Sequence, residues 1–227
     1  YYKMSFKQYL PYYKRNLRVA LPVMLTQLGA SLVGLFDSIM VGHYATVDLA
    51  AVSFANALFF MAMVFAMGAL MAITPLVGVR VGEMNTRPEE QTEIRYKIAV
   101  LFQNGMLFTL LQSVLMLLLL GGCLPFLEYF GQDPAVIEVA RPYYILIVIS
   151  LVPFLIFTFF KQFLEGLGNT LVAMIITLAM NALNIFLNWI FIYGHWGVEA
   201  MGATGAGIGS LISRVGMALC FFAAIWF

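Results

Sequence analysis

One acid lies alone inside an apolar stretch near the start of the chain. Asp37 is part of GLFDSIMVG, and no other charged residue occurs between Val19 and Val41. An ionisable side chain at the centre of a bilayer costs on the order of 3 kcal/mol. Because burial disfavours the charged form, such an acid can alternate between a neutral protonated state and an anion that attracts a cation. This is the chemistry of an H+ or Na+ relay.

Helical geometry predicts that Asp37 lies on a polar face. At 100° per residue it shares one stripe with small or polar positions and borders another. That face suits contact with other helices or a water-filled cavity. The alternative is a structural role, in which Asp37 accepts a hydrogen bond or pairs with Arg214, a base deep in a later apolar segment. The two stripes comprise Thr26, Ala30, Val33, Gln27, Ser31, Gly34 and Ser38.

Three asparagines follow helical spacing in the segment MNALNIFLNWIFIYG. Asn181, Asn184 and Asn188 fall within about 60° of one helix face. Their carbonyl oxygens can coordinate a cation, and their amides can hydrogen-bond a protonated acid. Polar side chains also hold helices together in a membrane. The sequence leaves both interpretations open.

Two methionines add a possible binding surface. Met63 and Met67 share one face of a predicted helix, and flexible thioethers suit the binding of varied apolar ligands. They are also ordinary filler in membrane helices. If they bind substrate, we expect them to line a cavity together with Gln27 and Asn181.

The composition indicates which elements must position these side chains. The 227 residues are 63% hydrophobic and 10% charged, with a mean hydropathy of +0.93. A soluble domain carries roughly a quarter charged residues, so most of this chain is expected to lie in a bilayer. A spanning helix needs about 20 apolar residues. The sequence therefore predicts an all-α membrane protein with six transmembrane helices, at about 17–41, 49–79, 97–121, 141–161, 171–193 and 204–227.

The distribution of cations predicts the orientation. Arg141 is the one cation expected on one side of the membrane, and Arg214 lies within the last span. The other ten lie on the opposite side, in the N-terminal segment, in the loop between spans two and three, and after span four. By the positive-inside rule the N-terminus is cytoplasmic in a multi-pass inner-membrane protein. These ten are Lys3, Lys7, Lys14, Arg15, Arg18, Arg80, Arg87, Arg95, Lys97 and Lys161.

Several function classes lack their sequence features. The glycine-rich segment MGATGAGIGSLISR has the wrong spacing for a nucleotide-binding loop, and its small residues suit close helix packing. Intramembrane proteases need paired acids, a zinc motif or a Ser-His pair, which the sequence lacks. A channel would need a selectivity filter, and no re-entrant loop is evident. We expect no enzyme activity, no cofactor and no nucleic-acid partner.

Several segments, in order, resemble one transporter family. They are ALPVMLTQLGASLVGLFDSIMVGHYATVDLAAVSFAN, GALMAITPLVGVRVGEMN, FGQDPAVIEVARPYY, and NIFLNWIFIYG followed by MGATGAGIGSLIS. Their order and spacing resemble the N-terminal half of a multidrug and toxic compound extrusion (MATE) transporter of the NorM-like branch. The resemblance implies twelve helices in two six-helix lobes around a central cavity. Residues 1–227 would be the N-terminal lobe, a fragment whose partner is the missing C-terminal lobe.

The resemblance also implies a function and roles for residues. Such transporters export cationic and amphipathic drugs in exchange for H+ or Na+. Asp37 matches the family's first-span acid, and Pro22 matches a proline where the first helix bends. Asn184 and Asn188 fall on an Asn-x-x-x-Asp pattern in which Asn188 replaces the acid, and Thr204 matches a threonine of the same branch. With Asp37, the two asparagines would form the proton or Na+ site.

One alternative with a related fold remains. A flippase moving lipid-linked intermediates would bind pyrophosphate and would favour a cationic cavity. Because Arg214 is the one base expected deep in a span, the sequence favours cationic substrates instead.

Overall fold

The structure is a computed structural model that describes residues 6–226, without the side chains of residues 6–11 and 15. Lys3 therefore lies outside the described residues, as do the side chains of Lys7 and Arg15. Every element in the described part is helical. The α-helices are α1 (Phe6–Tyr44), α2 (Thr46–Leu70), α3 (Ile73–Thr86), α4 (Gln91–Cys123), α5 (Pro134–Ile149), α6 (Leu151–Gly166), α7 (Thr170–Tyr193) and α8 (Gly202–Trp226), and the 3-10 helices are η1 (Pro88–Glu90) and η2 (Leu124–Phe130).

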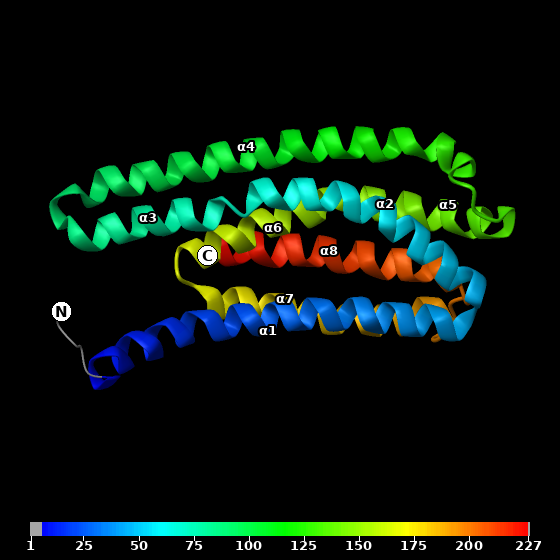
Figure 1. The fold of residues 1–227 in the computed structure, drawn as a ribbon, viewed down its shortest axis with the longest axis horizontal. Helices are drawn as coiled ribbons and strands as arrows, with labels where there is room; N and C mark the ends of the chain where they lie inside the picture. Colours follow the sequence, from blue (N-terminus) through cyan, green and yellow to red (C-terminus); the bar gives the residue numbers. More distant parts are fainter. Residues whose placement is uncertain (1–5, 227) are drawn as a thin grey trace.

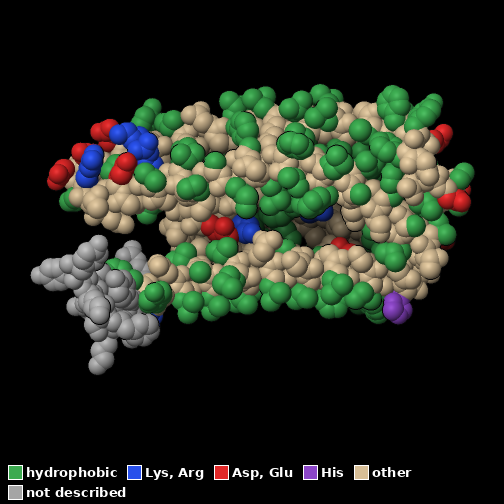
Figure 2. All heavy atoms as spheres, viewed as in Figure 1, with side chains coloured by type: hydrophobic (Ala, Val, Ile, Leu, Met, Phe, Trp, Pro, Cys, Tyr) green, Lys and Arg blue, Asp and Glu red, His purple; other side chains and the backbone are tan. Residues whose placement is uncertain are grey.

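These helices form six segments long and apolar enough to cross a membrane, which confirms the predicted fold class. Two of the segments are helix pairs, α2 with α3 and α5 with α6. Large apolar side chains cover the outer surfaces of the bundle, as Figure 2 shows along both of its long edges. In a bilayer these apolar side chains contact lipid tails, so the surface does not have to be polar. The chain is a multi-pass membrane protein.

The second span differs from the predicted continuous helix over 49–79. It is broken between α2 and α3 at Met71 and Ala72. Pro75 explains the break, because it has no N–H to donate to the carbonyl of Met71 and its ring clashes with that carbonyl. The chain resumes helical bonding when the Leu76 N–H donates to the carbonyl of Ala72 at 3.3 Å.

The fourth span differs from the prediction of 141–161 in the same way. Helices α5 and α6 meet at Ser150, and Pro153 lies four residues after Ile149, whose carbonyl it cannot bond. The span also continues to Gly166. Lys161 therefore lies inside α6 and not in the loop after span four.

The helices pack around an interior gap. Helix α1 packs on α7, α7 on α8, and α8 on α5 and α6, while α4 packs on α3 and α6. Figure 1 shows α1 and α7 together along one edge of the bundle and α4 along the other, with α2, α6 and α8 between them. Aromatic rings fill the contact between α4 and α6, where Phe102 lies 5.0–6.1 Å from the rings of Phe159, Phe160 and Phe163.

Pro22 does not interrupt α1, which is helical from Phe6 to Tyr44. In Figure 1 the N-terminal part of this helix is inclined to the rest. That inclination agrees in kind with the expected bend, whose assignment to Pro22 stays a prediction.

Candidate functional site

A cavity of about 400 Å³ lies between the α1–α7 pair and the rest of the bundle. Figure 2 shows the surface hollowed along this boundary, with acidic and basic side chains visible inside. The structure brings together most of the side chains that the sequence suggested. Those lining the cavity are Asp37, Asn184, Asn181, Gln27, Met63 and Met67.

Asp37 is held by an amide from α7. The Nδ2 group of Asn188 donates to Asp37 Oδ1 at 2.6 Å. The same Nδ2 lies 3.4 Å from Oδ1 of Asn184, one turn earlier. Asn188 is fully buried behind the cavity wall, and Asn184 is 5% exposed. Asn188 thus points toward the first span, as predicted, and Asn184 is buried in the cavity lining. Their role as ligands of the coupling ion stays a prediction.

Asn188 also carries an acceptor with no partner. Its Oδ1 atom is buried and receives no hydrogen bond, although buried polar groups in proteins are nearly always paired. Gly209 of α8 makes room for this oxygen, because a Cβ at Gly209 would collide with Asn188 Oδ1. A close glycine contact thus positions an unsatisfied oxygen on the side chain that binds Asp37.

This arrangement fits both forms of an exchangeable acid. Protonated Asp37 can donate from its second oxygen to Asn188 Oδ1 while still accepting from Nδ2, which pairs acid and amide completely. Alternatively, the carboxylate and the Oδ1 atoms of Asn184 and Asn188 supply the oxygen ligands that a hard cation such as Na+ prefers. Either species would satisfy the unpaired oxygen.

Thr204 and Pro22 are not part of this cluster. Thr204 lies half-buried in the first turn of α8, and Pro22 lies buried in α1. Neither lines the cavity. Their roles stay predictions that depend on the family resemblance.

The opposite side of the cavity carries a base. Arg214 of α8 lines the cavity, and its Nη1 donates to Ser150 Oγ at 2.6 Å, at the break between α5 and α6. Its guanidinium carbon lies 5.0 Å from the ring centre of Phe59 and 5.1 Å from that of Phe154. The structural alternative in which Asp37 pairs with Arg214 is not observed. Among the described residues, no ion pair of 4.0 Å or less includes either side chain.

Other polar residues of the cavity escaped the sequence analysis. Asn56 of α2 lines it and accepts a hydrogen bond from the Tyr143 hydroxyl at 3.1 Å. Lys161 and Gln162 of α6 line it as well. Asn56 could have been found by the rule applied to Asp37, since it is a strongly polar side chain in an apolar run. Lys161 was missed because α6 extends further than predicted.

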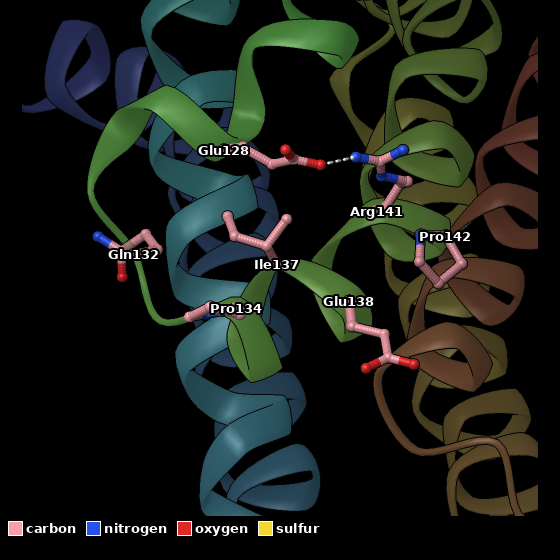
Figure 3. Close-up of a pocket in the computed structure, with 7 residues that line it drawn as sticks. All are labelled: Glu128, Gln132, Pro134, Ile137, Glu138, Arg141 and Pro142. Atoms are coloured by element: carbon pink, nitrogen blue, oxygen red, sulfur yellow. Dashed lines mark hydrogen bonds and ion pairs between the residues drawn. The ribbon is translucent and has the colours of Figure 1, made fainter.

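A second hollow, of about 460 Å³, lies at the connection between α4 and α5. Figure 3 shows Glu128 of η2 and Arg141 of α5 pointing toward one another, while Gln132 points away from them. The two form an ion pair of 2.7 Å whose side chains are 68% and 47% exposed. Exposed pairs of this kind contribute little to stability. The hollow shares no lining residue with the cavity around Asp37.

Comparison with known proteins identifies relatives over most of the chain. The MatE family model matches residues 22–190. The multidrug resistance protein NorM of Photobacterium profundum is 31% identical over 199 residues, which cover 88% of this chain and 42% of that protein. A probable multidrug resistance protein NorM of Bacillus subtilis is 30% identical over 209 residues, with the same two shares. The chain thus spans about two fifths of the length of these relatives.

Solved structures share the fold. The Vibrio cholerae MATE transporter VcmN in its bent form superposes with a TM-score of 0.70 at 22% identity, covering 99% of this chain and 49% of that one. An outward-facing multidrug resistance MATE family transporter gives a TM-score of 0.75 at 22% identity, with shares of 94% and 44%. Each matched structure is about twice as long as the chain.

Proposed function

Since the chain belongs to the MatE family, we propose that it forms the N-terminal lobe of a secondary active antiporter. This antiporter exports cationic and amphipathic drugs across the cytoplasmic membrane in exchange for H+ or Na+. The family supports transport in place of catalysis. Because the chain spans less than half of its relatives, a second lobe of six helices completes the proposed transporter.

The observation that carries this proposal is the unpaired Oδ1 of Asn188 beside Asp37. An unpaired buried acceptor costs about 1–3 kcal/mol, and this one belongs to the same side chain that bonds Asp37. Asn188 Oδ1 is unpaired when the site is empty and gains a partner when H+ or Na+ binds. Binding of the ion therefore stabilises the site. The coupling ion therefore binds among Asp37, Asn184 and Asn188.

Binding of the ion changes how α1 contacts α7. With Asp37 ionised, a single hydrogen bond joins it to Asn188, and the carboxylate attracts a cation from the cavity. Once neutralised, the same pair gains a second interaction, and α1 repacks around Pro22. Each state favours a different access conformation, and a ligand shifts such an equilibrium by its differential affinity for the two states.

The cavity lining supports amphipathic substrates. Phe60, Met63 and Met67 supply apolar, adaptable surface, and Gln27 and Asn181 supply polar groups. Apolar pockets with a few polar groups are typical of small-molecule sites. The carboxylate of Asp37 supplies the negative charge that a cationic drug needs.

One observation favours the flippase alternative, and a second observation weakens it. Lys161 joins Arg214 in the cavity, which a pyrophosphate group would favour. However, Lys161 Nζ lies 3.8 Å from Glu165 Oε1, so its charge has a partner. One unpaired base facing one acid suits a drug better than a pyrophosphate, so we retain drug export.

The orientation remains part of the proposal. Apart from Lys161, the described cations of the cation-rich side lie in the first part of α1 and around the connection between α3 and α4, so we place the N-terminus in the cytoplasm. Helix α1 begins and α8 ends toward the same end of the bundle, as an even number of spans requires (Figure 1).

The test is Asp37→Asn in the full-length transporter of which this lobe is a part. Asparagine keeps the size of the side chain but cannot be neutralised by H+ and attracts cations weakly. We expect the variant to insert at the wild-type level and to export drug more than about tenfold more slowly, within the usual range of coupling between sites. Dye efflux from energised vesicles measures the rate.

The control and the choice of ion use the same vesicles. Ser38→Ala changes a neighbouring exposed side chain whose hydroxyl bonds its own helix at Gly34, and it should export normally. Replacing NaCl by choline chloride at constant pH separates Na+ from H+ coupling. Export by Asp37→Asn at the wild-type rate under the same gradient would show that Asp37 is structural.

A further inference from the structure

Arg214 is a fixed positive charge in the cavity wall with no acid in contact with it. Arginine stays protonated in proteins. Its hydrogen bond goes to the neutral hydroxyl of Ser150. Among the described residues, no carboxylate oxygen lies within 4.0 Å of its nitrogens. Asp37 of the same cavity attracts it from a distance, so the guanidinium has a nearby acid but no counter-ion in contact with it, although a charge in a membrane segment is costly.

The contacts of Arg214 leave part of its fork free. A guanidinium carries five N–H donors in a plane, and the structure pairs Nη1 alone. The rings of Phe59 and Phe154 lie near the guanidinium and hold its orientation by cation–π attraction. The remaining nitrogens are not among the buried groups without a partner, so they stay accessible from the cavity that Arg214 lines. A fixed fork of this kind matches the two oxygens of a carboxylate.

From this geometry we propose that Arg214 binds an anionic group, a carboxylate above all, on the amphipathic substrate. The proposal rests on the drug export proposed above and extends it from cationic drugs to drugs that also carry an acid. Asn181 supports it, because this residue of the same cavity is 8% exposed and its Nδ2 donor has no partner. The aromatic and thioether side chains around Arg214 would contact the apolar body of the ligand.

The backbone positions that carry the two charges of the cavity lie at different depths. Gly209 of α8 is level with Asn188, which holds Asp37. Arg214 lies five residues further along α8, or about 7.5 Å along the helix axis. A ligand with positive and negative groups at opposite ends of an aromatic body would place one group near each side chain. A simple cation would use the Asp37 end alone.

The experiment compares two dyes that differ by one methyl ester. Rhodamine 110 carries a free carboxylate, and rhodamine 123 is its methyl ester. Each is titrated with the purified chain in lipid nanodiscs near neutral pH, and binding is followed by fluorescence polarisation, with empty nanodiscs subtracted. We expect the chain to bind the acid about tenfold more tightly than the ester, the size of one charge-assisted hydrogen bond.

Three variants assign the preference to Arg214. Arg214→Gln should weaken binding of the acid about tenfold while leaving the ester within about twofold. Arg214→Lys should keep part of the preference, because the charge remains without the fork. Arg80→Gln is the matched control, since Arg80 pairs with Glu83 outside the cavity and should change neither dye.

The outcomes separate binding from structure. Equal weakening of both dyes in Arg214→Gln would show that Arg214 only holds Ser150 in place, and the proposal would fail. A wild-type chain that binds no acid dye, or prefers the ester, would also overturn it. If Arg214→Gln does not fold, the wild-type ratio decides alone. Normal export by Asp37→Asn would refute the proposed coupling without changing this ratio.

Discussion

The two sides of the cavity treat charge in opposite ways. The acid wall, made by Asp37, Asn184 and Asn188, lies between α1 and α7 and leaves an amide oxygen unpaired. The base wall, made by Arg214, Ser150, Phe59 and Phe154, fixes its guanidinium with one hydroxyl and two rings. A carboxylate can be neutralised under ordinary conditions, whereas a guanidinium cannot. One wall can therefore switch while the other stays constant.

Their places in the bundle match this difference. The acid wall joins helix α1, whose span is largely exposed, to its main partner α7, so its contact can change while most of the bundle stays packed. The base wall lies where α8 packs against α5 and α6, which form the most buried of the six spans. Ion binding at Asp37 can therefore shift the acid wall, while the base wall keeps its position against the substrate.

The largest effect on this comparison is expected from Gly209→Ala. The added Cβ would collide with Asn188 Oδ1 and push the amide away from its present position. Overpacking of this kind costs about 1–3 kcal/mol, and we expect about 2 kcal/mol for the chain in mixed micelles. Equilibrium unfolding followed by circular dichroism measures it.

Gly121→Ala is the matched control. No atom lies within 4 Å of a Cβ at Gly121, which is also helical. Alanine there should be neutral or stabilising by about 0.5–1 kcal/mol, because glycine loses more backbone entropy on folding. If Gly209→Ala behaved like this control, the acid wall would be looser than the structure indicates.

A smaller effect is expected from Ser150→Ala on the base wall. Ser150 is fully buried, and its loss removes the one hydroxyl that Arg214 bonds. We expect a cost of about 1 kcal/mol, at the low end for an unpaired donor because water in the cavity can replace the hydroxyl. The same unfolding measurement applies. Ser31→Ala, at an exposed serine that bonds its own helix, should stay within about 0.5 kcal/mol.

A cost for Ser150→Ala no larger than that for Ser31→Ala would mean that the two rings alone hold Arg214. The base wall would then be fixed by stacking and not by the helix break. The charge of the base wall would still stay constant, because the arginine side chain remains protonated.

The smallest effect is expected from coupling between the walls. Asp37 and Arg214 attract one another across the cavity, yet no ion pair of 4.0 Å or less joins them among the described residues, so a double-mutant cycle of Asp37→Asn and Arg214→Gln should give about 0.5–1 kcal/mol. Lys161 and Glu165, 3.8 Å apart, provide a reference pair that should couple more strongly. A coupling above about 2 kcal/mol between the walls would refute their independence.

The sequence by itself determined the class of this protein and its central acid. A chain that is 63% hydrophobic needs a bilayer, and six apolar runs become six spans because each helix satisfies its own backbone. Asp37 could be singled out because an ionisable side chain in the membrane is energetically costly and therefore usually functional. Helical spacing placed Asn184 and Asn188 on one face. These inferences depend on local properties of the chain, which sequence records directly.

Only the tertiary structure decided which partners these residues have. Pro75 and Pro153 were visible in the sequence, but whether a membrane proline bends or breaks its helix depends on the packing around it. The contact of Asn188 with Asp37 joins residues 151 positions apart. The absence of an Asp37–Arg214 ion pair and the presence of Lys161 in the cavity lining likewise depend on where α1, α6 and α8 lie. Side-chain pairing across helices is set by distance in space, which the order of residues along a chain does not give.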